Sequence, residues 1–119
     1  MQTNVRSSGK STILDLEGKL VHGAEGQLIE LFNQLLTKGQ KYVLLNLAEI
    51  SVIDSIGIGI LVKVYKDTVA AGGKLKLLNP TIRMRQNLSM TSLHSVFEIF
   101  DDETTALASF NAIGKTGST

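Results

Sequence analysis

The chain has 119 residues, of which 43% are hydrophobic and 19% charged, and its formal net charge is +1. This length suits one domain around one core, and so small a net charge gives no electrostatic basis for binding nucleic acid or an anionic membrane. Cysteine is absent and no apolar run approaches the ~20 residues that span a bilayer, which excludes disulfides, thiolate metal sites and direct membrane insertion. The first ten residues lack the apolar segment of a signal peptide, so we expect a cytoplasmic protein.

In chain order, apolar and turn residues predict strands and helices that alternate through most of the chain. Period-two alternation and short apolar runs predict strands, whereas apolar residues at helical spacing, closed by glycine, predict helices. The expected elements are an extended piece around Val5, a turn over 7–10, a strand over 12–17, a helix over 24–38, a strand over 42–47, a helix over 56–71, a strand over 74–78, a helix from Pro80 to about Met90, a strand over 97–100 and a last helix that starts at 101–103. This order is typical of an α/β domain with a largely parallel sheet. We expect a single domain over 1–113 and a flexible tail over 114–119.

The strand over 12–17 is expected to have one apolar face and one mixed face. Leu14 and Leu16 share the apolar face, while the mixed face carries Ile13, Asp15 and Glu17. A mixed face is typical of a half-exposed strand near the edge of a sheet.

Two helix starts are predicted from their capping residues. Asn79 and Pro80 supply an N-cap and a first-turn proline, and the acidic residues 101–103 place negative charge at the start of the last helix. The inner face of that last helix is expected to carry Ala106, Phe110 and Ile113.

A polar segment with two glycines, Asp54, Ser55, Gly57 and Gly59 among its residues, interrupts the apolar sequence before the second long helix. The preceding strand is expected to end near Leu47, so the segment follows the carboxyl edge of a parallel sheet, where ligand and partner sites collect. Ser55 stands at the expected N-cap, where free N–H groups and the helix dipole favour an added negative charge. Glycine at 57 is expected to leave the hydroxyl unobstructed, so that a phosphoryl group on Ser55 is accommodated.

A serine that only caps the helix also explains this residue, because serine is among the commonest N-caps. Two features favour a docking surface instead. Ile56 and Ile58 place apolar side chains beside the hydroxyl, and two glycines inside a helix cost ~1 kcal/mol each relative to alanine.

Residues 43–73, VLLNLAEISVIDSIGIGILVKVYKDTVAAGG, resemble the signature region of STAS domains. The anti-sigma factor antagonist branch is the most similar, because its pattern runs from a strand through Asp-Ser-Ser/Thr-Gly-Leu-Gly into a helix that ends in Gly-Gly. The resemblance is specific at the Asp-Ser pair and the two spaced glycines, and it extends more diffusely over residues 12–110. It implies a STAS fold: a mixed four- to five-stranded sheet with a largely parallel core and antiparallel N-terminal strands, packed by about four helices.

The resemblance implies a regulatory function rather than an enzymatic one. In that branch the serine after the aspartate, Ser55 here, is phosphorylated by an anti-sigma factor that is itself a serine kinase, and a serine phosphatase removes the phosphate. The unphosphorylated protein sequesters the anti-sigma factor and thereby frees a sigma factor. We expect Asp54, Ile56, Gly57 and Ile58 to contact the partner, and we expect no cofactor or metal ion.

Three positions depart from the family pattern. Ile56 replaces a second hydroxyl, Val21 replaces a carboxylate that lies near the phosphorylated serine in the family fold, and Ser92 replaces a glycine. Ile56 and Val21 keep a second function open, because STAS domains also occur as non-phosphorylated docking subunits of membrane transport systems. A weak homodimer is left open as well.

Other motifs do not support catalysis or nucleotide binding. The sequence GKST over 9–12 resembles the end of a phosphate-binding loop, but the required glycine five positions earlier is asparagine, and a strand follows instead of a helix. The two histidines lack metal-ligand spacing, and the adjacent Asp54 and Ser55 rarely face each other, so we expect neither a metal centre nor a catalytic triad.

Overall fold

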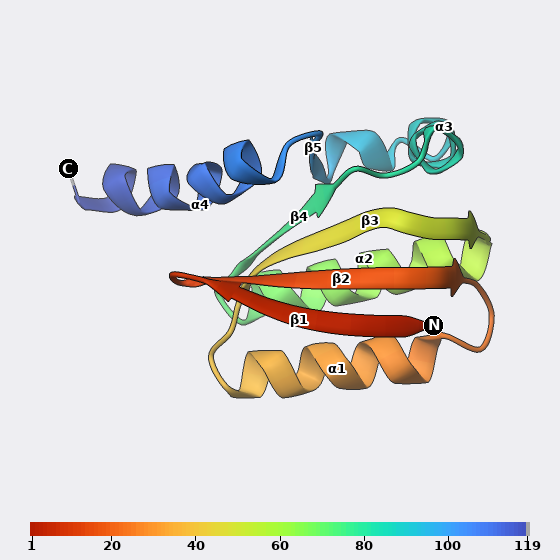
Figure 1. The fold of residues 1–119 in the computed structure, drawn as a ribbon, viewed down its shortest axis with the longest axis horizontal. Coiled ribbons are helices and arrows are strands. Elements are labelled where there is room, and N and C mark those ends of the chain that lie inside the picture. Colours follow the sequence, from red (N-terminus) through yellow and green to blue (C-terminus); the bar gives the residue numbers. More distant parts are fainter. Residues whose placement is uncertain (119) are drawn as a thin grey trace.

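The computed structural model describes residues 1–118, with side chains described for residues 1–111. It contains five strands, four α-helices and one short 3-10 turn, η1, arranged as Figure 1 shows. In chain order the elements are β1 (Gln2–Ser8), β2 (Ser11–Leu20), α1 (Glu25–Thr37), β3 (Tyr42–Ile53), α2 (Ser55–Ala70), β4 (Lys74–Leu78), α3 (Ile82–Met90), η1 (Leu93–Ser95), β5 (Glu98–Phe100) and α4 (Glu103–Ser118).

The five strands form one mixed sheet in the order β1-β2-β3-β4-β5. The β1–β2 hairpin is antiparallel, and the three remaining pairs of neighbouring strands are parallel. Each parallel connection contains a helix, as a crossover between parallel strands normally does. The expected mixed sheet with about four helices is therefore confirmed.

Alternation along the strands divides the core between the two faces of the sheet. Leu14 and Leu16 of β2 belong to the larger cluster, which also includes the inner faces of α1 and α2. Ile13 belongs to a smaller cluster with Leu44 and Leu78, which α4 covers on the other face. Residues 42–47 are nearly continuously apolar because β3 lies between these two clusters.

Strand β3 is longer than the sequence indicates. The expected end is near Leu47, but the strand continues to Ile53. The apolar run on which the expectation depends stops at Leu47, and beyond it the register shifts in the pairing with β2, between Asp15 and Lys19, break the alternation of buried and exposed residues that would mark a strand. As a result, Asp54 alone separates β3 from α2, and the Asp-Ser segment does not follow a loop.

Helix α3 starts later than expected, because Thr81 is its N-cap instead of Asn79. Thr81 is extended (φ −64°, ψ 162°), and its Oγ1 accepts the N–H of Met84 at 3.3 Å. Asn79 adopts a positive φ of 51° and donates its N–H to the carbonyl of Phe100 at 2.8 Å. Asn79 and Pro80 therefore form the connection from β4 to α3, and the prediction that they start the helix is wrong.

The acidic start of α4 is confirmed, because Asp102 Oδ2 accepts the N–H of Thr105 at 2.8 Å. Ala106 and Phe110 are buried as expected. The side chain of Ile113 and those of the expected tail over 114–119 lie outside the described residues, so the domain boundary at 113 stays a prediction. In the part of the chain that the structure describes, no helix is long and apolar enough to cross a membrane.

Ser92 occupies a backbone conformation that glycine adopts more easily, with φ 62° and ψ 12° before η1. A non-glycine residue in this conformation costs about 1–2 kcal/mol of stability, and glycine avoids that cost. Glycine also loses more conformational freedom on folding, which costs about 0.5–1 kcal/mol and offsets part of the gain. We therefore expect Ser92→Gly to raise the free energy of unfolding in urea by about 0.5–1 kcal/mol. Asn79→Gly is the matched control at φ 51°, with a smaller expected gain because asparagine tolerates this region better. A loss of stability in Ser92→Gly would contradict the prediction.

Candidate functional site

The Asp-Ser segment lies where β3 ends and α2 begins, at the carboxyl edge of the parallel strands. Asp54, rather than Ser55, caps the helix. Its backbone is extended (φ −116°, ψ −175°), and its Oδ1 accepts the N–H of Gly57 at 2.8 Å. Aspartate and serine are about equally good caps, and the continuation of β3 to Ile53 determines which of them occupies the position. The prediction that Ser55 is the N-cap is wrong by one residue.

Backbone N–H groups hold Asp54 in its ionised form. Besides the bond from Gly57, the N–H of His22 donates to Oδ2 at 3.2 Å. The N–H groups of Gly57, His22 and Ile56 lower the pKa of Asp54, in that order of importance. Asp54 therefore positions the segment, and its lowered pKa makes it a weaker base toward the Ser55 hydroxyl than an ordinary carboxylate.

Ser55 is the first residue of α2, and it is exposed. The first N–H groups of a helix have no acceptor within the helix. The Asp54 carboxylate accepts one of them, from Gly57, while the Asp54 carbonyl accepts the first intrahelical hydrogen bond, from Ile58 at 3.0 Å. Among the described residues, none accepts the N–H of Ser55. The helix dipole and this N–H favour an added negative charge at the serine.

Gly57 has a different structural role from the expected one. A Cβ atom at this position would lie 1.9 Å from the carbonyl oxygen of Leu20 and 2.9 Å from Cγ1 of Ile53. Gly57 therefore lets α2 approach the end of β2 closely, and it does not serve to clear space beside the hydroxyl. A Cβ at Gly59 would meet no atom within 4 Å, so that glycine faces open space.

Apolar surface lies next to Ser55. Ile56 is 43% exposed, whereas Ile58 is partly buried against the larger core cluster. Met90 of α3 is 82% exposed and lines a groove of about 390 Å³ together with Ser55. The residues that line this groove are Ile53, Asp54, Ser55, Ile58, Asn87, Met90 and Thr91.

The contribution of α3 to this groove is not apparent in the sequence. Met90 is one apolar residue at the end of a short helix, and its exposure becomes clear only once α3 is placed beside α2. The one signal in the sequence is indirect: Ser92, which departs from the family pattern, directly follows Thr91, and Thr91 lines the groove.

The β2–α1 loop, Val21–Ala24, is bonded to the residue that precedes Ser55. The carbonyl of Leu20, at the end of β2, accepts the N–H of Asp54 at 3.4 Å, and His22 donates to the Asp54 carboxylate. Val21, which replaces the family carboxylate, is partly buried and adds no charge to this junction.

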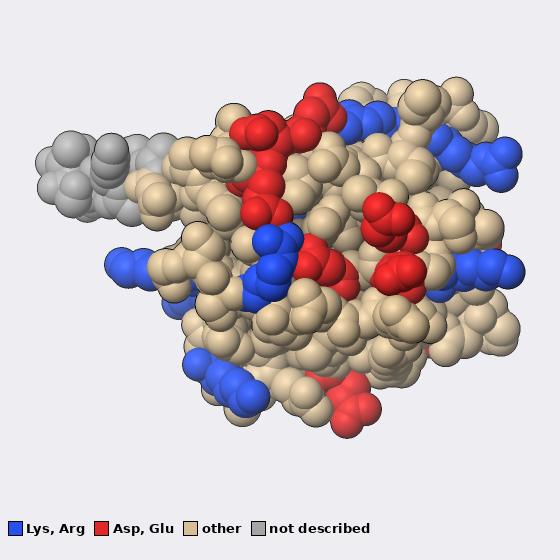
Figure 2. Space-filling view, in the orientation of Figure 1, with Lys and Arg blue, Asp and Glu red and all other residues tan. Residues whose placement is uncertain are grey.

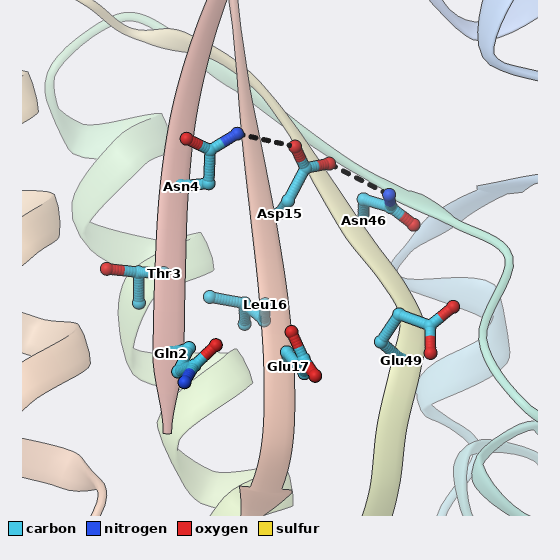
Figure 3. Close-up of a pocket in the computed structure, with 8 residues that line it drawn as sticks. All are labelled: Gln2, Thr3, Asn4, Asp15, Leu16, Glu17, Asn46 and Glu49. Carbon is cyan, nitrogen blue, oxygen red and sulfur yellow. Dashed lines mark hydrogen bonds between the residues drawn. The ribbon is translucent and has the colours of Figure 1, made fainter.

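A second polar surface lies on the sheet face opposite α1 and α2. Figure 3 shows polar side chains of β1, β2 and β3 around a shallow pocket of about 140 Å³. Asp15 accepts hydrogen bonds there from Asn46 at 2.8 Å, from Asn4 at 3.2 Å and from Arg6 at 2.7 and 2.9 Å. Arg6 also pairs with Glu103 of α4 at 2.7 Å. Acidic side chains gather across the middle of this face (Figure 2), but the Asp15 network is fully engaged in joining the hairpin to β3 and α4.

The Asp15–Arg6 pair predicts a pH dependence of stability. The hydrogen bonds from Arg6 lower the pKa of Asp15 from 3.8 to about 2. A depressed pKa contributes stability that is present above pH ~4 and is lost as the pH falls toward ~2. We expect a loss of about 1–2 kcal/mol over this range, discounted because the Arg6 side chain is 39% exposed. Urea unfolding at several pH values measures it.

Asp15→Asn is expected to remove this pH dependence, whereas Glu17→Gln keeps it. Glu17 lies on the same face but makes no salt bridge among the described residues, so it controls for the loss of a charge. An unchanged profile in Asp15→Asn would contradict the prediction.

The remaining motifs do not form a ligand site. The sequence GKST begins in the tight turn of the β1–β2 hairpin, where Gly9 has a φ of 59°, and continues into β2. Among the described residues, no group of three or more His, Asp or Glu side chains is placed to hold a metal ion.

Comparison with known proteins identifies the family. The family model of the STAS domain matches residues 2–106. A Thermotoga neapolitana protein named as a homologue of the anti-sigma factor antagonist TM1081 is 34% identical over 76 residues, which are 64% of this chain and 67% of that protein. The crystal structure of TM1081 from Thermotoga maritima has a TM-score of 0.84 at 24% identity, covering 90% of this chain and 92% of that one.

A further solved structure with the same fold is that of a phosphorylated protein. The Bacillus cell fate determinant SpoIIAA, in its phosphorylated form, has a TM-score of 0.72 at 22% identity, covering 92% of this chain and 99% of that one. At such identities the two structural likenesses concern the fold, whereas the family model matches most of the sequence. The chain therefore belongs to the STAS domain family, in its anti-sigma factor antagonist branch.

Proposed function

We propose that the chain is a phosphorylation-controlled anti-sigma factor antagonist. In its unphosphorylated form it sequesters an anti-sigma factor, itself a serine kinase, and thereby frees a sigma factor for transcription. One observation carries the proposal: Ser55 is the exposed first residue of α2, directly after its N-cap and beside the exposed Ile56. The proposal places the protein in the cytoplasm, where ATP and sigma factors are found.

The unmodified surface suits a protein partner. Ile56 and Met90 expose apolar area next to the groove that Ser55 lines, and burying apolar area stabilises a complex by about 25 cal/mol per Å² before the costs of association. The Ser55 hydroxyl can exchange its bond to water for one to the partner. Asp54, Ile56, Gly57 and Ile58 are proposed as partner-binding residues, with Gly57 acting through the position of α2.

Phosphorylation consumes one ATP and releases ADP. Oγ of Ser55 forms a bond to the γ-phosphorus, the bond between that phosphorus and the ADP oxygen breaks, and the ADP leaves with the electron pair. The hydroxyl proton passes to a base of the kinase, because the N–H partners of Asp54 lower its pKa and make it a weak base. A serine phosphatase restores Ser55 by hydrolysis, with water supplying the new hydroxyl and inorganic phosphate leaving.

The charge of the phosphate destabilises the complex with the partner more than it destabilises the folded domain. A phosphoserine carries about −1.5 to −2 charge at neutral pH, which the N-terminus of α2 accommodates. A partner packed over Ser55 and Ile56 has to desolvate that charge, so the complex dissociates without a large rearrangement of the domain.

The first test is the intact mass of the protein after incubation with its cognate anti-sigma kinase and MgATP. We expect one phosphate on the wild type, none on Ser55→Ala, and one on Ser51→Ala. Ser51 is the matched control because it is an exposed hydroxyl only a few residues away on β3. Absence of phosphate in the presence of an active kinase would contradict the proposal. Copurification with a transporter subunit would then favour a constitutive docking module.

A further inference from the structure

The N-cap of α2 connects two segments that are distant in the sequence. Oδ1 of Asp54 accepts the N–H of Gly57 in α2 at 2.8 Å, and Oδ2 accepts the N–H of His22 in the β2–α1 loop at 3.2 Å. The other hydrogen bonds of this loop are local: Ala24 N–H donates to the Val21 carbonyl, Gly23 N–H donates to a side chain in the first turn of α1, and Leu28 N–H donates to the Ala24 carbonyl. Among the described residues, the bond from His22 to Asp54 is therefore the only one that ties the loop to an element other than α1, which follows it directly in the chain.

A phosphoryl group on Ser55 competes directly with Asp54. It is adjacent in sequence, it carries the same sign of charge, and it offers three strong acceptor oxygens to the same helix N-terminus. Among the described residues, none accepts the N–H of Ser55, and only the Asp54 carboxylate accepts the N–H of Gly57. Ser55 and Ile56 are exposed and Asp54 is partly exposed, so the carboxylate has a solvent side toward which it can turn, away from the phosphate.

We infer that phosphorylation of Ser55 displaces the Asp54 carboxylate and thereby releases the β2–α1 loop. This inference rests on the proposed phosphorylation of Ser55, and it adds a second surface to the switch. The loop carries the exposed His22 and, together with Met1 and Gln27, borders a separate depression of about 500 Å³. A partner that contacts both the Ser55 surface and this loop detects the modification at two places.

The test uses protein with phosphoserine inserted at position 55 during translation, so that no kinase and no partner are needed. The amide signals of His22 and Gly57 in ¹H–¹⁵N NMR spectra, and their hydrogen-exchange rates, are compared with those of unmodified protein. We expect the His22 amide signal to shift and its exchange to accelerate about tenfold, as the loss of one ordinary hydrogen bond implies. An unchanged His22 amide in the phosphorylated protein would overturn the inference.

Two variants test whether phosphorylation acts on the His22 amide through Asp54, the relay proposed above, or through a general loosening of the fold. Asp54→Asn keeps one acceptor oxygen for Gly57 but turns a donor toward His22, so its His22 amide is expected to be free before phosphorylation and to change little afterward. Asp102→Asn is the matched control, because Asp102 caps α4 with the same chemistry. It should leave the response of His22 to phosphoserine intact, and loss of that response would count against a local relay.

Partner binding distinguishes failure of this inference from failure of the proposed function. If phosphoserine at 55 abolishes binding of the anti-sigma factor while the His22 amide stays unchanged, the switch stands and the relay is wrong. If the His22 amide responds but binding is unaffected, the relay stands and the proposed switch is wrong.

Discussion

Phosphoserine at position 55 is expected to weaken binding of the anti-sigma factor by more than about a hundredfold while the domain stays folded. A penalty of about 3 kcal/mol suffices for this factor, and desolvating most of a doubly charged group against apolar surface costs at least that much. Ser55 is exposed, with Ile56 beside it and Met90 lining the same groove, so a partner covering this surface has to cover the phosphate. Calorimetric titration of the phosphorylated and unmodified proteins, at one fixed salt concentration, measures the change in affinity.

A phosphoserine inserted in place of Thr104 provides the matched control. Thr104 is exposed in the first turn of α4, close behind an aspartate N-cap, so the local electrostatics resemble those at Ser55. Among the described residues, none of α4 lines the groove beside Ser55, so we expect the modification at 104 to leave the affinity nearly unchanged. Equal losses at both positions would show that net charge, rather than the Ser55 surface, controls binding. Thermal unfolding of both proteins confirms that neither modification unfolds the domain.

The sequence predicts the general fold because the core follows simple periodicities. Leu14 and Leu16 alternate with Ile13 along β2, and this alternation assigns them to opposite faces without knowledge of the tertiary structure. The pattern fails where bulges interrupt it. The register shifts between β2 and β3 leave Ile50 and Ile53 buried three residues apart, a spacing that does not indicate a strand, and so the end of β3 is misplaced.

In the candidate site, too, some features can be predicted from the local sequence, whereas others depend on the tertiary structure. Asp54 and Ser55 are recognisable as a pair at a helix start, but both are good caps, and only the length of β3 decides between them. The place of Met90 in the groove beside Ser55 depends on the tertiary position of α3, which no local pattern contains. The local sequence does not distinguish Gly57 from Gly59. A side chain at 57 would collide with the carbonyl of Leu20, which is distant along the chain, whereas a Cβ at 59 would meet no atom within 4 Å.

Gly57→Ala is expected to lower the free energy of unfolding by about 3 kcal/mol. The new methyl group would lie 1.9 Å from the carbonyl oxygen of Leu20, so α2 or the end of β2 has to move, and overpacking of this kind costs about 1–3 kcal/mol and sometimes more. The hydrogen bond from Gly57 to Asp54 is strained by the same movement, which adds to the loss. The gain of about 1 kcal/mol in helix propensity offsets only part of this cost. The melting temperature should fall by about 10 °C, measured by scanning calorimetry.

Gly59→Ala tests whether the effect comes from the contact or from the helix. Gly59 lies two residues further along α2, and an added Cβ there meets no atom within 4 Å. The propensity gain is then unopposed, so we expect a stabilisation of up to about 1 kcal/mol, opposite in sign to the effect at 57. If both alanines stabilised the protein, the close approach of α2 to Leu20 would not be essential. Opposite signs would show that Gly57 is required because it lets α2 approach the carbonyl of Leu20, at the end of β2, more closely than a side chain would permit.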